Sequence, residues 1–219
     1  GQRGIVEDLY QVTSWIKQQY PHLPIYLLGH SMGSLVVRCY LEKYDQQVQG
    51  VILSGSPSCN PLAGFGIFIA SLFSKIKGDH YRPYLLQIAF ESFQNGFEDI
   101  DNSWICSDLE VIKKYNQAPL CQFVFTAQGF QTLFQLMKQT YSKHPIHNPS
   151  LPIYFLAGQD DPCIINTKKF NQAIAHQQRL GYLDVNSHLF IDMRHEILNE
   201  KNNDIVYQYI LDLLKTWQK

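Results

Sequence analysis

Short apolar runs alternate with amphipathic stretches along this chain. Four runs have the apolar character of buried strands: residues 25–28, 51–54, 153–157 and 185–191. Residues 34–41 follow the first run with apolar side chains at helical spacing, and residues 7–17 have the pattern of a helix leading into it. Strands that alternate with helices are typical of a parallel sheet. The pattern therefore predicts an α/β fold with helices flanking a mostly parallel sheet.

The turn after the first run carries the sequence Gly29-His30-Ser31-Met32-Gly33. A serine in a sharp turn between strand and helix is typical of a nucleophile elbow, in which glycines two residues away on either side let strand and helix approach closely. The backbone N–H of Met32 begins the helix, where the helix dipole favours an oxyanion. Such a string also occurs by chance, but here both flanks have the required pattern. Ser31 is the candidate nucleophile and Met32 a candidate oxyanion-hole donor.

A serine nucleophile needs a histidine to take its proton and an acid to orient that histidine. In an α/β-hydrolase sheet the acid and then the histidine follow the serine in chain order, each at the end of a strand. The third apolar run leads into Asp160 and Asp161, and both qualify from the residues alone. The fourth run ends before His195, the candidate base, whereas His188 lies inside that run and is expected to be structural.

The stretch between the second and third runs is too long for a simple crossover. It predicts three parts: residues 1–56 as hydrolase core with the elbow, 57–150 as a helical cap insertion, and 151–219 as core with the acid and histidine loops. Residues 61–73 and 123–137 are rich in large apolar side chains. Taken one at a time, each of these side chains is accounted for by packing of the cap onto the sheet. As a whole, an apolar cap suits an acyl chain, and a mobile one can contact a membrane surface.

Composition excludes some classes of function. Among the 219 residues, 18 basic and 19 acidic side chains give a net charge of −1 without a basic block, which argues against a nucleic-acid partner. Five cysteines without paired spacing indicate free thiols in a reducing compartment, so we expect a cytoplasmic protein, peripheral to the membrane at most, whose cysteines serve packing. No apolar run is long enough to cross a bilayer. His144 and His147 lack a third ligand, and no metal site is predicted.

Three segments together carry a family resemblance: the elbow, residues 158–162 and residues 194–200, Arg-His-Glu-Ile-Leu-Asn-Glu. They resemble the lysophospholipase and monoacylglycerol lipase group of α/β-hydrolases, and residues 119–126 and Trp104 are similar as well. The resemblance implies an α/β-hydrolase fold without metal or organic cofactor. It makes Ser31 the nucleophile, Asp161 the acid and His195 the base, because the acid of the family follows its glycine by three residues.

Three departures from the family accompany this resemblance. Cys163 stands where the family usually has a small aliphatic residue. Asp192 replaces a glycine before the histidine loop, but Asp tolerates a left-handed backbone. The family also begins with several strands, one of whose loops gives the second oxyanion donor, and only residues 1–23 precede the strand that leads to the elbow here. Since a buried parallel strand with a bare edge exposes unpaired backbone, we expect the chain to be part of a longer hydrolase.

These features predict a serine hydrolase that cleaves carboxylic esters of lipids, a lysophospholipid or a monoacylglycerol, through an acyl-enzyme. Two alternatives stay open at this stage. One is an esterase for short-chain substrates, because fold and triad do not set specificity. The other is a truncated, inactive hydrolase that acts as a binding module, because losing one oxyanion donor costs about a hundredfold to a thousandfold in turnover.

Overall fold

A single parallel sheet forms the centre of the protein. The computed structural model describes residues 1–121 and 123–218, and its four strands lie in the order β1-β2-β3-β4. The strands are β1 Tyr26–His30, β2 Gly50–Ser54, β3 Ile153–Gly158 and β4 Val185–Phe190. All neighbouring pairs are parallel. The predicted α/β architecture is confirmed, although β1 runs on to His30 because its pairing with β2 continues as far as Ser54.

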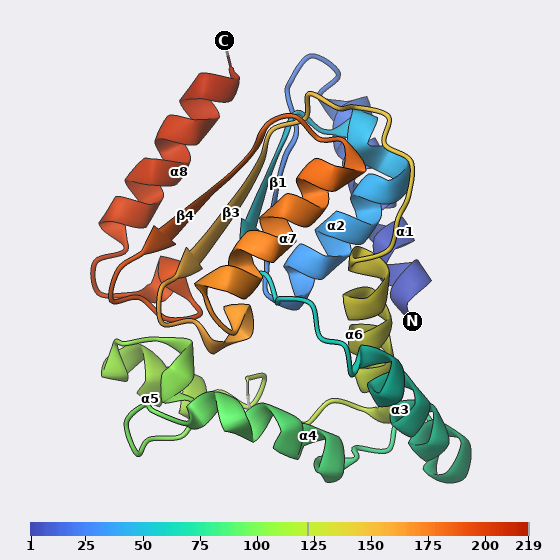
Figure 1. The fold of residues 1–219 in the computed structure, drawn as a ribbon, viewed down its shortest axis with the longest axis vertical. Helices are drawn as coiled ribbons and strands as arrows, with labels where there is room; N and C mark the ends of the chain where they lie inside the picture. The colour runs from blue at the N-terminus through green and yellow to red at the C-terminus, as the bar shows by residue number, and fades with distance from the viewer. Residues whose placement is uncertain (122, 219) are drawn as a thin grey trace.

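Helices cover both faces of the sheet (Figure 1). One face carries α1 Gln2–Gln19, α2 Met32–Tyr44 and α7 Thr167–Leu180, and the other carries α8 Asp204–Trp217. Neighbouring strand residues belong to different cores: Val51 lies in the core with α2, and Ile52 in the core with α8. Because side chains alternate along a strand, a sheet buried on both faces needs continuous apolar runs, which is the pattern of β2 and β3.

The segment between β2 and β3 is helical. Its helices are α3 Ala63–Lys77, α4 Tyr84–Glu91, α5 Leu109–Gln117 and α6 Ala127–Thr140. In Figure 1, α4 and α5 lie beyond the carboxyl ends of the strands, the edge to which the arrowheads point. On α6, Leu136 belongs to the main core, whereas Phe130 and Phe134 pack with Ala70 of α3. Helices α4 and α5 therefore lie where a cap would cover the carboxyl ends of the strands (Figure 1), and the boundaries of the predicted cap, 57–150, stay a prediction.

Short 3-10 helices complete the chain: Asp45–Gln47, Ser92–Gln94, Ser103–Ile105, Pro162–Ile164 and Ile197–Asn199. None of the helices in the described ranges combines the length and the apolar character that crossing a bilayer requires.

The five cysteines are all free thiols, but they differ in their surroundings. Cys39, Cys106 and Cys163 are buried, as predicted for packing residues. Cys59 and Cys121 are exposed, so the packing prediction is wrong for these two. Both lie in loops, whereas the loop residue Cys106 packs in a cluster with Ile105 and Ile112.

Candidate active site

Ser31 lies at the turn between β1 and α2 in a strained conformation. Its φ of 52° and ψ of −121° lie in a region that costs a non-glycine residue about 1–3 kcal/mol. Neighbouring groups hold this geometry: the Ser31 N–H donates to the carbonyl of Ser54 at 2.9 Å, and the Ser34 N–H donates to the Ser31 carbonyl at 3.0 Å. A strained serine at the carboxyl end of a parallel strand is the geometry of a nucleophile elbow.

The two glycines of the motif have different roles. A Cβ on Gly29 would lie 2.7 Å from the carbonyl oxygen of Gly33, so the strand and helix pass too closely for any side chain there. A Cβ on Gly33 would meet nothing within 4 Å. The prediction that both glycines permit the close approach is therefore wrong for Gly33, because its own Cα faces open space while its carbonyl approaches Gly29.

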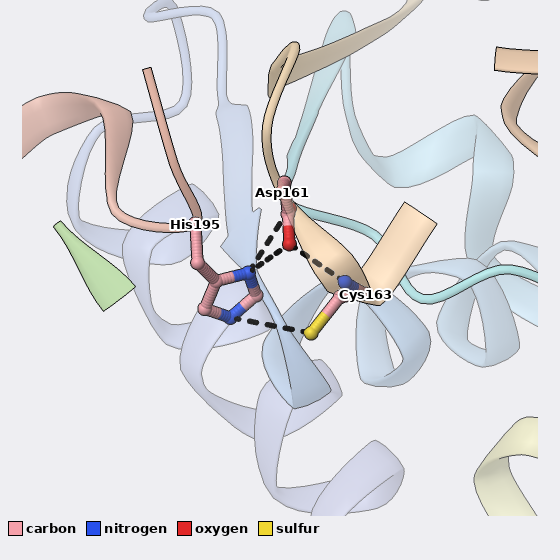
Figure 2. A group of neighbouring side chains, drawn as sticks. All are labelled: Asp161, Cys163 and His195. Atoms are coloured by element: carbon pink, nitrogen blue, oxygen red, sulfur yellow. Dashed lines mark hydrogen bonds and ion pairs between the residues drawn. The ribbon is translucent and has the colours of Figure 1, made fainter. Parts of the chain in front are cut away.

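Asp161 and His195 form a buried pair at the same edge of the sheet (Figure 2). The Nδ1 atom of His195 lies 3.0 Å from both carboxylate oxygens of Asp161, and the two residues are only 4% and 3% exposed. Asp161 follows β3, and His195 follows β4 after a turn in which Asp192 has a φ of 57°, the left-handed conformation expected there. Asp160 is exposed. Of the two adjacent carboxylates, only Asp161 meets the histidine.

Burial and charge set the protonation of this pair. Burial lowers the pKa of His195, but the negative charges of Cys163 and Asp161 and the hydrogen bonds to these two side chains together have the larger effect and raise the pKa well above its usual 6.5. Burial also raises the pKa of the Cys163 thiol. A raised pKa makes the imidazole a stronger proton acceptor.

His30 lies beside Ser31 and against the candidate base. Its ring centroid is 4.7 Å from that of His195, and its Nδ1 is 3.4 Å from the Ser54 hydroxyl oxygen. Burial, followed by the positive charge of His195, lowers the pKa of His30 to about 4. His30 is thus a neutral packing partner at pH 7.

The hydroxyl of Ser31 makes no hydrogen bond to His195 within residues 1–121 and 123–218. The Nε2 atom of His195 instead lies 4.0 Å from the Sγ atom of Cys163. Hydrogen bonds of catalytic groups are often long or unmade before substrate binds. The structure therefore brings Asp161 and His195 together and places the turn that carries Ser31 against the imidazole, without joining serine to histidine.

Gly55 is a residue of the site that sequence reasoning missed. It follows β2 with a φ of 55°, and a Cβ on it would lie 3.0 Å from Cε1 and Nδ1 of His195. Gly158, at the end of β3, is equally constrained, since a Cβ there would lie 2.1 Å from the carbonyl oxygen of Met193. The sequence did offer one indication of this role, because Gly55 directly follows the apolar run 51–54. Both glycines leave room for the histidine loop.

Arg194 and Glu200 tie the histidine loop to residues 98–107. The Arg194 guanidinium donates to both carboxylate oxygens of Glu98, at 2.7 and 2.8 Å, and to the carbonyl of Ser103 at 2.6 Å. The buried carboxylate of Glu200 accepts from the backbone N–H groups of Arg194, at 2.8 Å, and of Ser107, at 3.1 Å. These bonds fix the backbone on both sides of His195. The sequence showed these residues only as part of the family-like tail.

Trp104 belongs to the same segment and packs on the base. Its ring centroid lies 5.2 Å from that of His195. An aromatic face beside a buried imidazole keeps water from that side of the ring. The segment 98–107 thus both anchors and shields the histidine.

Comparison with known proteins places this geometry in context. Residues 2–202 match the model of the family described as serine aminopeptidase, S33. A thermostable carboxyl esterase from Bacillus coagulans, solved with glycerol, superposes with a TM-score of 0.84 at 23% identity, covering 96% of this chain and 70% of the esterase. No curated protein sequence matches this chain.

Two solved lipases share the fold as well. A monoacylglycerol lipase from Paleococcus ferrophilus has a TM-score of 0.68 at 18% identity, covering 97% of this chain and 76% of that one. A soluble variant of the monoglyceride lipase from Saccharomyces cerevisiae, solved with a substrate analogue, has a TM-score of 0.69 at 19% identity. The match covers 99% of this chain and 68% of the lipase. At these identities the likeness shows the α/β-hydrolase fold.

Proposed function

Because the chain belongs to the serine aminopeptidase S33 family, we propose that it is a serine hydrolase that cleaves carboxylic esters of lipids. The observation that carries the proposal is the buried Asp161–His195 pair, with both carboxylate oxygens 3.0 Å from Nδ1, at the sheet edge where Ser31 is held in its strained turn. A paired acid and histidine at the end of successive strands, after an elbow serine, have the chain order of a hydrolase triad.

In the proposed mechanism each residue has one task. The carboxylate of Asp161 only accepts hydrogen bonds, so in the neutral, reactive form of His195 the Nδ1 atom carries the hydrogen and Nε2 is left to accept the proton of Ser31. Ser31 attacks the ester carbonyl, and the imidazolium then protonates the leaving alcohol. Met32 is the first residue of α2, and the first N–H groups of a helix lack an intrahelical partner. Its N–H stabilises the oxyanion, and water releases the acyl group.

The proposal of a lipid substrate rests on exposed apolar side chains between β2 and β3. On α3, Phe65, Phe68, Leu72 and Ile76 recur at helical spacing and are 44–66% exposed. On α4, Tyr84, Leu85 and Ile88 are also exposed. Large exposed apolar patches mark ligand grooves and membrane contacts. We assign this surface, over α3 and α4, to the acyl chain and to peripheral contact with the lipid surface that presents it.

A peptide substrate is the alternative that the name of the family raises. An aminopeptidase must bind a free α-ammonium group, and a carboxylate near the nucleophile is the strongest acceptor for it. The carboxylates next to the histidine loop are already engaged: Glu98 binds Arg194, and Glu200 accepts backbone N–H groups. This arrangement favours an ester over an aminoacyl substrate.

A panel of substrates tests the proposal. Purified protein is incubated with a monoacylglycerol, a lysophospholipid, a short-chain aryl ester and an aminoacyl arylamide, with Ser31→Ala as the control. Lipid ester hydrolysis that disappears in Ser31→Ala supports the proposal. Turnover of the short-chain ester alone would make the protein a short-chain esterase, and turnover of the arylamide alone a peptidase. A folded protein without any turnover would favour the binding module.

A further inference from the structure

Cys163 is the buried group of the site that ester hydrolysis does not use. Its Sγ atom lies 4.0 Å from Nε2 of His195. The ligand atoms of Asp161, Cys163 and His195 all lie within 4.8 Å of one another, and the three residues are 3%, 8% and 4% exposed. Figure 2 shows the carboxylate beside Nδ1 and the sulfur beside Nε2, on the same side of the imidazole ring. A thiol and an imidazole nitrogen thus face each other in a buried part of the site.

The backbone around Cys163 is fixed before any ligand binds. Its N–H donates to Oδ1 of Asp161 at 2.8 Å, and its carbonyl accepts from the N–H of Ser58 at 3.1 Å. The next carbonyl, that of Ile164, accepts from the Ser58 hydroxyl at 2.8 Å. The backbone that carries the sulfur is therefore held in position beside the imidazole.

This spacing suits zinc. With Zn–S of about 2.3 Å, Zn–N of about 2.0–2.1 Å and a tetrahedral angle, the two ligand atoms of a bound zinc lie roughly 3.6 Å apart. The observed 4.0 Å needs only a small side-chain rotation. Metal-bound histidines almost always donate their other N–H to a carboxylate, which orients the ring and strengthens the ligand. The bond from Nδ1 of His195 to Asp161 already supplies that partner.

We propose that Cys163 and His195 bind a thiophilic divalent cation of the Zn²⁺ class, and that this cation switches the hydrolase off. The inhibitory consequence rests on the proposed function, because Nε2 is the atom that accepts the proton of Ser31. On binding, the thiol releases its proton to solvent, sulfur and Nε2 each donate an electron pair, and water fills the remaining positions. The histidine then has no lone pair for catalysis.

Binding is tested first, apart from activity. Co²⁺ is titrated into the purified Ser31→Ala protein, and the thiolate-to-cobalt charge-transfer band is followed by absorption. We expect one saturable Co²⁺ per chain, displaced by Zn²⁺. Cys163→Val and Cys163→Ser, each checked for folding by circular dichroism, are expected to weaken binding by about tenfold or more, since even second-shell losses cost about 10–100-fold. Cys59→Ala removes an exposed thiol and is the matched control, in which the band should stay.

Inhibition is tested second, on the active protein. We expect Zn²⁺ to abolish hydrolysis, EDTA to restore it, and either Cys163 variant to raise the inhibition constant about tenfold or more. A band that is absent, or that survives in both folded Cys163 variants, would overturn the site. If the protein hydrolyses no ester at all, the Co²⁺ band still decides the question of binding, so failure of the proposed function and failure of this site are distinguishable.

Discussion

The Nδ1 atom of His195 lies 3.0 Å from both carboxylate oxygens of Asp161. The preceding residue, Asp160, is exposed. Asp161→Asn replaces an acceptor with an amide that can donate, and so favours the wrong imidazole tautomer. We expect turnover of the preferred ester to fall about 10⁴-fold. Asp160→Asn is the matched control and should leave the initial rate unchanged. Equal losses in the two variants would show that Asp161 has no special role.

The elbow glycines give a second pair of matched variants. In Gly29→Ala the new Cβ would lie 2.7 Å from the Gly33 carbonyl oxygen, and overpacking of this kind costs about 1–3 kcal/mol of the free energy of unfolding. In Gly33→Ala the new methyl group meets nothing, and alanine is the better helix former by about 1 kcal/mol. Urea denaturation should therefore rank Gly33→Ala at or above the unmodified protein and Gly29→Ala below it. The reverse order would contradict the geometry of this turn.

The carboxylate of Glu200 is expected to hold the histidine loop. It is 3% exposed and accepts from the N–H groups of Arg194 and Ser107 and from the Ser107 hydroxyl, so Glu200→Gln weakens three charge-assisted bonds. We expect a loss of about 1.5–3 kcal/mol in the free energy of unfolding. Glu196→Gln, in the same loop, alters only an exposed bond from Asn199 and should change stability little. Denaturant titrations of both variants check this, and similar stabilities would count against the role of Glu200.

Stability should also depend on His176 below neutral pH. Burial, then the positive charges of Arg38 and Arg179, lower the pKa of His176 to about 4 in the folded protein, against about 6.5 in the unfolded chain. Between these values the unfolded chain binds a proton that the folded protein does not, so acidification favours unfolding. Relative to His176→Gln, the unmodified protein should lose stability as the pH falls from about 6.5 towards 4. Parallel denaturation curves at every pH would contradict this.

Much of the fold follows from local pattern. The four apolar runs became the four strands, and the turn at Asp192 adopts the expected left-handed backbone. Each of these depends on residues that are close in sequence. The chain order led to His195, and the family resemblance selected Asp161 over Asp160; the structure brings Asp161 and His195 together.

Other features depend on contacts between distant segments, which no local pattern records. The bonds from Arg194 to Glu98, the packing of Trp104 on His195 and the room that Gly55 leaves for the imidazole all join residues separated by about 90 positions or more. The different roles of Gly29 and Gly33 depend on the angle between strand and helix. Such contacts between distant segments depend on the three-dimensional positions of the loops, which the sequence pattern does not give.

Labelling of Ser31 by a fluorophosphonate probe tests the central claim most directly. Such probes phosphonylate a serine that a neighbouring base activates. The purified protein is treated with the probe, and the labelled peptide is mapped by mass spectrometry, with Ser31→Ala as the control. Stoichiometric labelling confined to Ser31, lost in Ser31→Ala and strongly slowed in Asp161→Asn, is the predicted result. A folded protein that is not labelled, or is labelled elsewhere, would contradict the assignment of Ser31, Asp161 and His195 as a working triad.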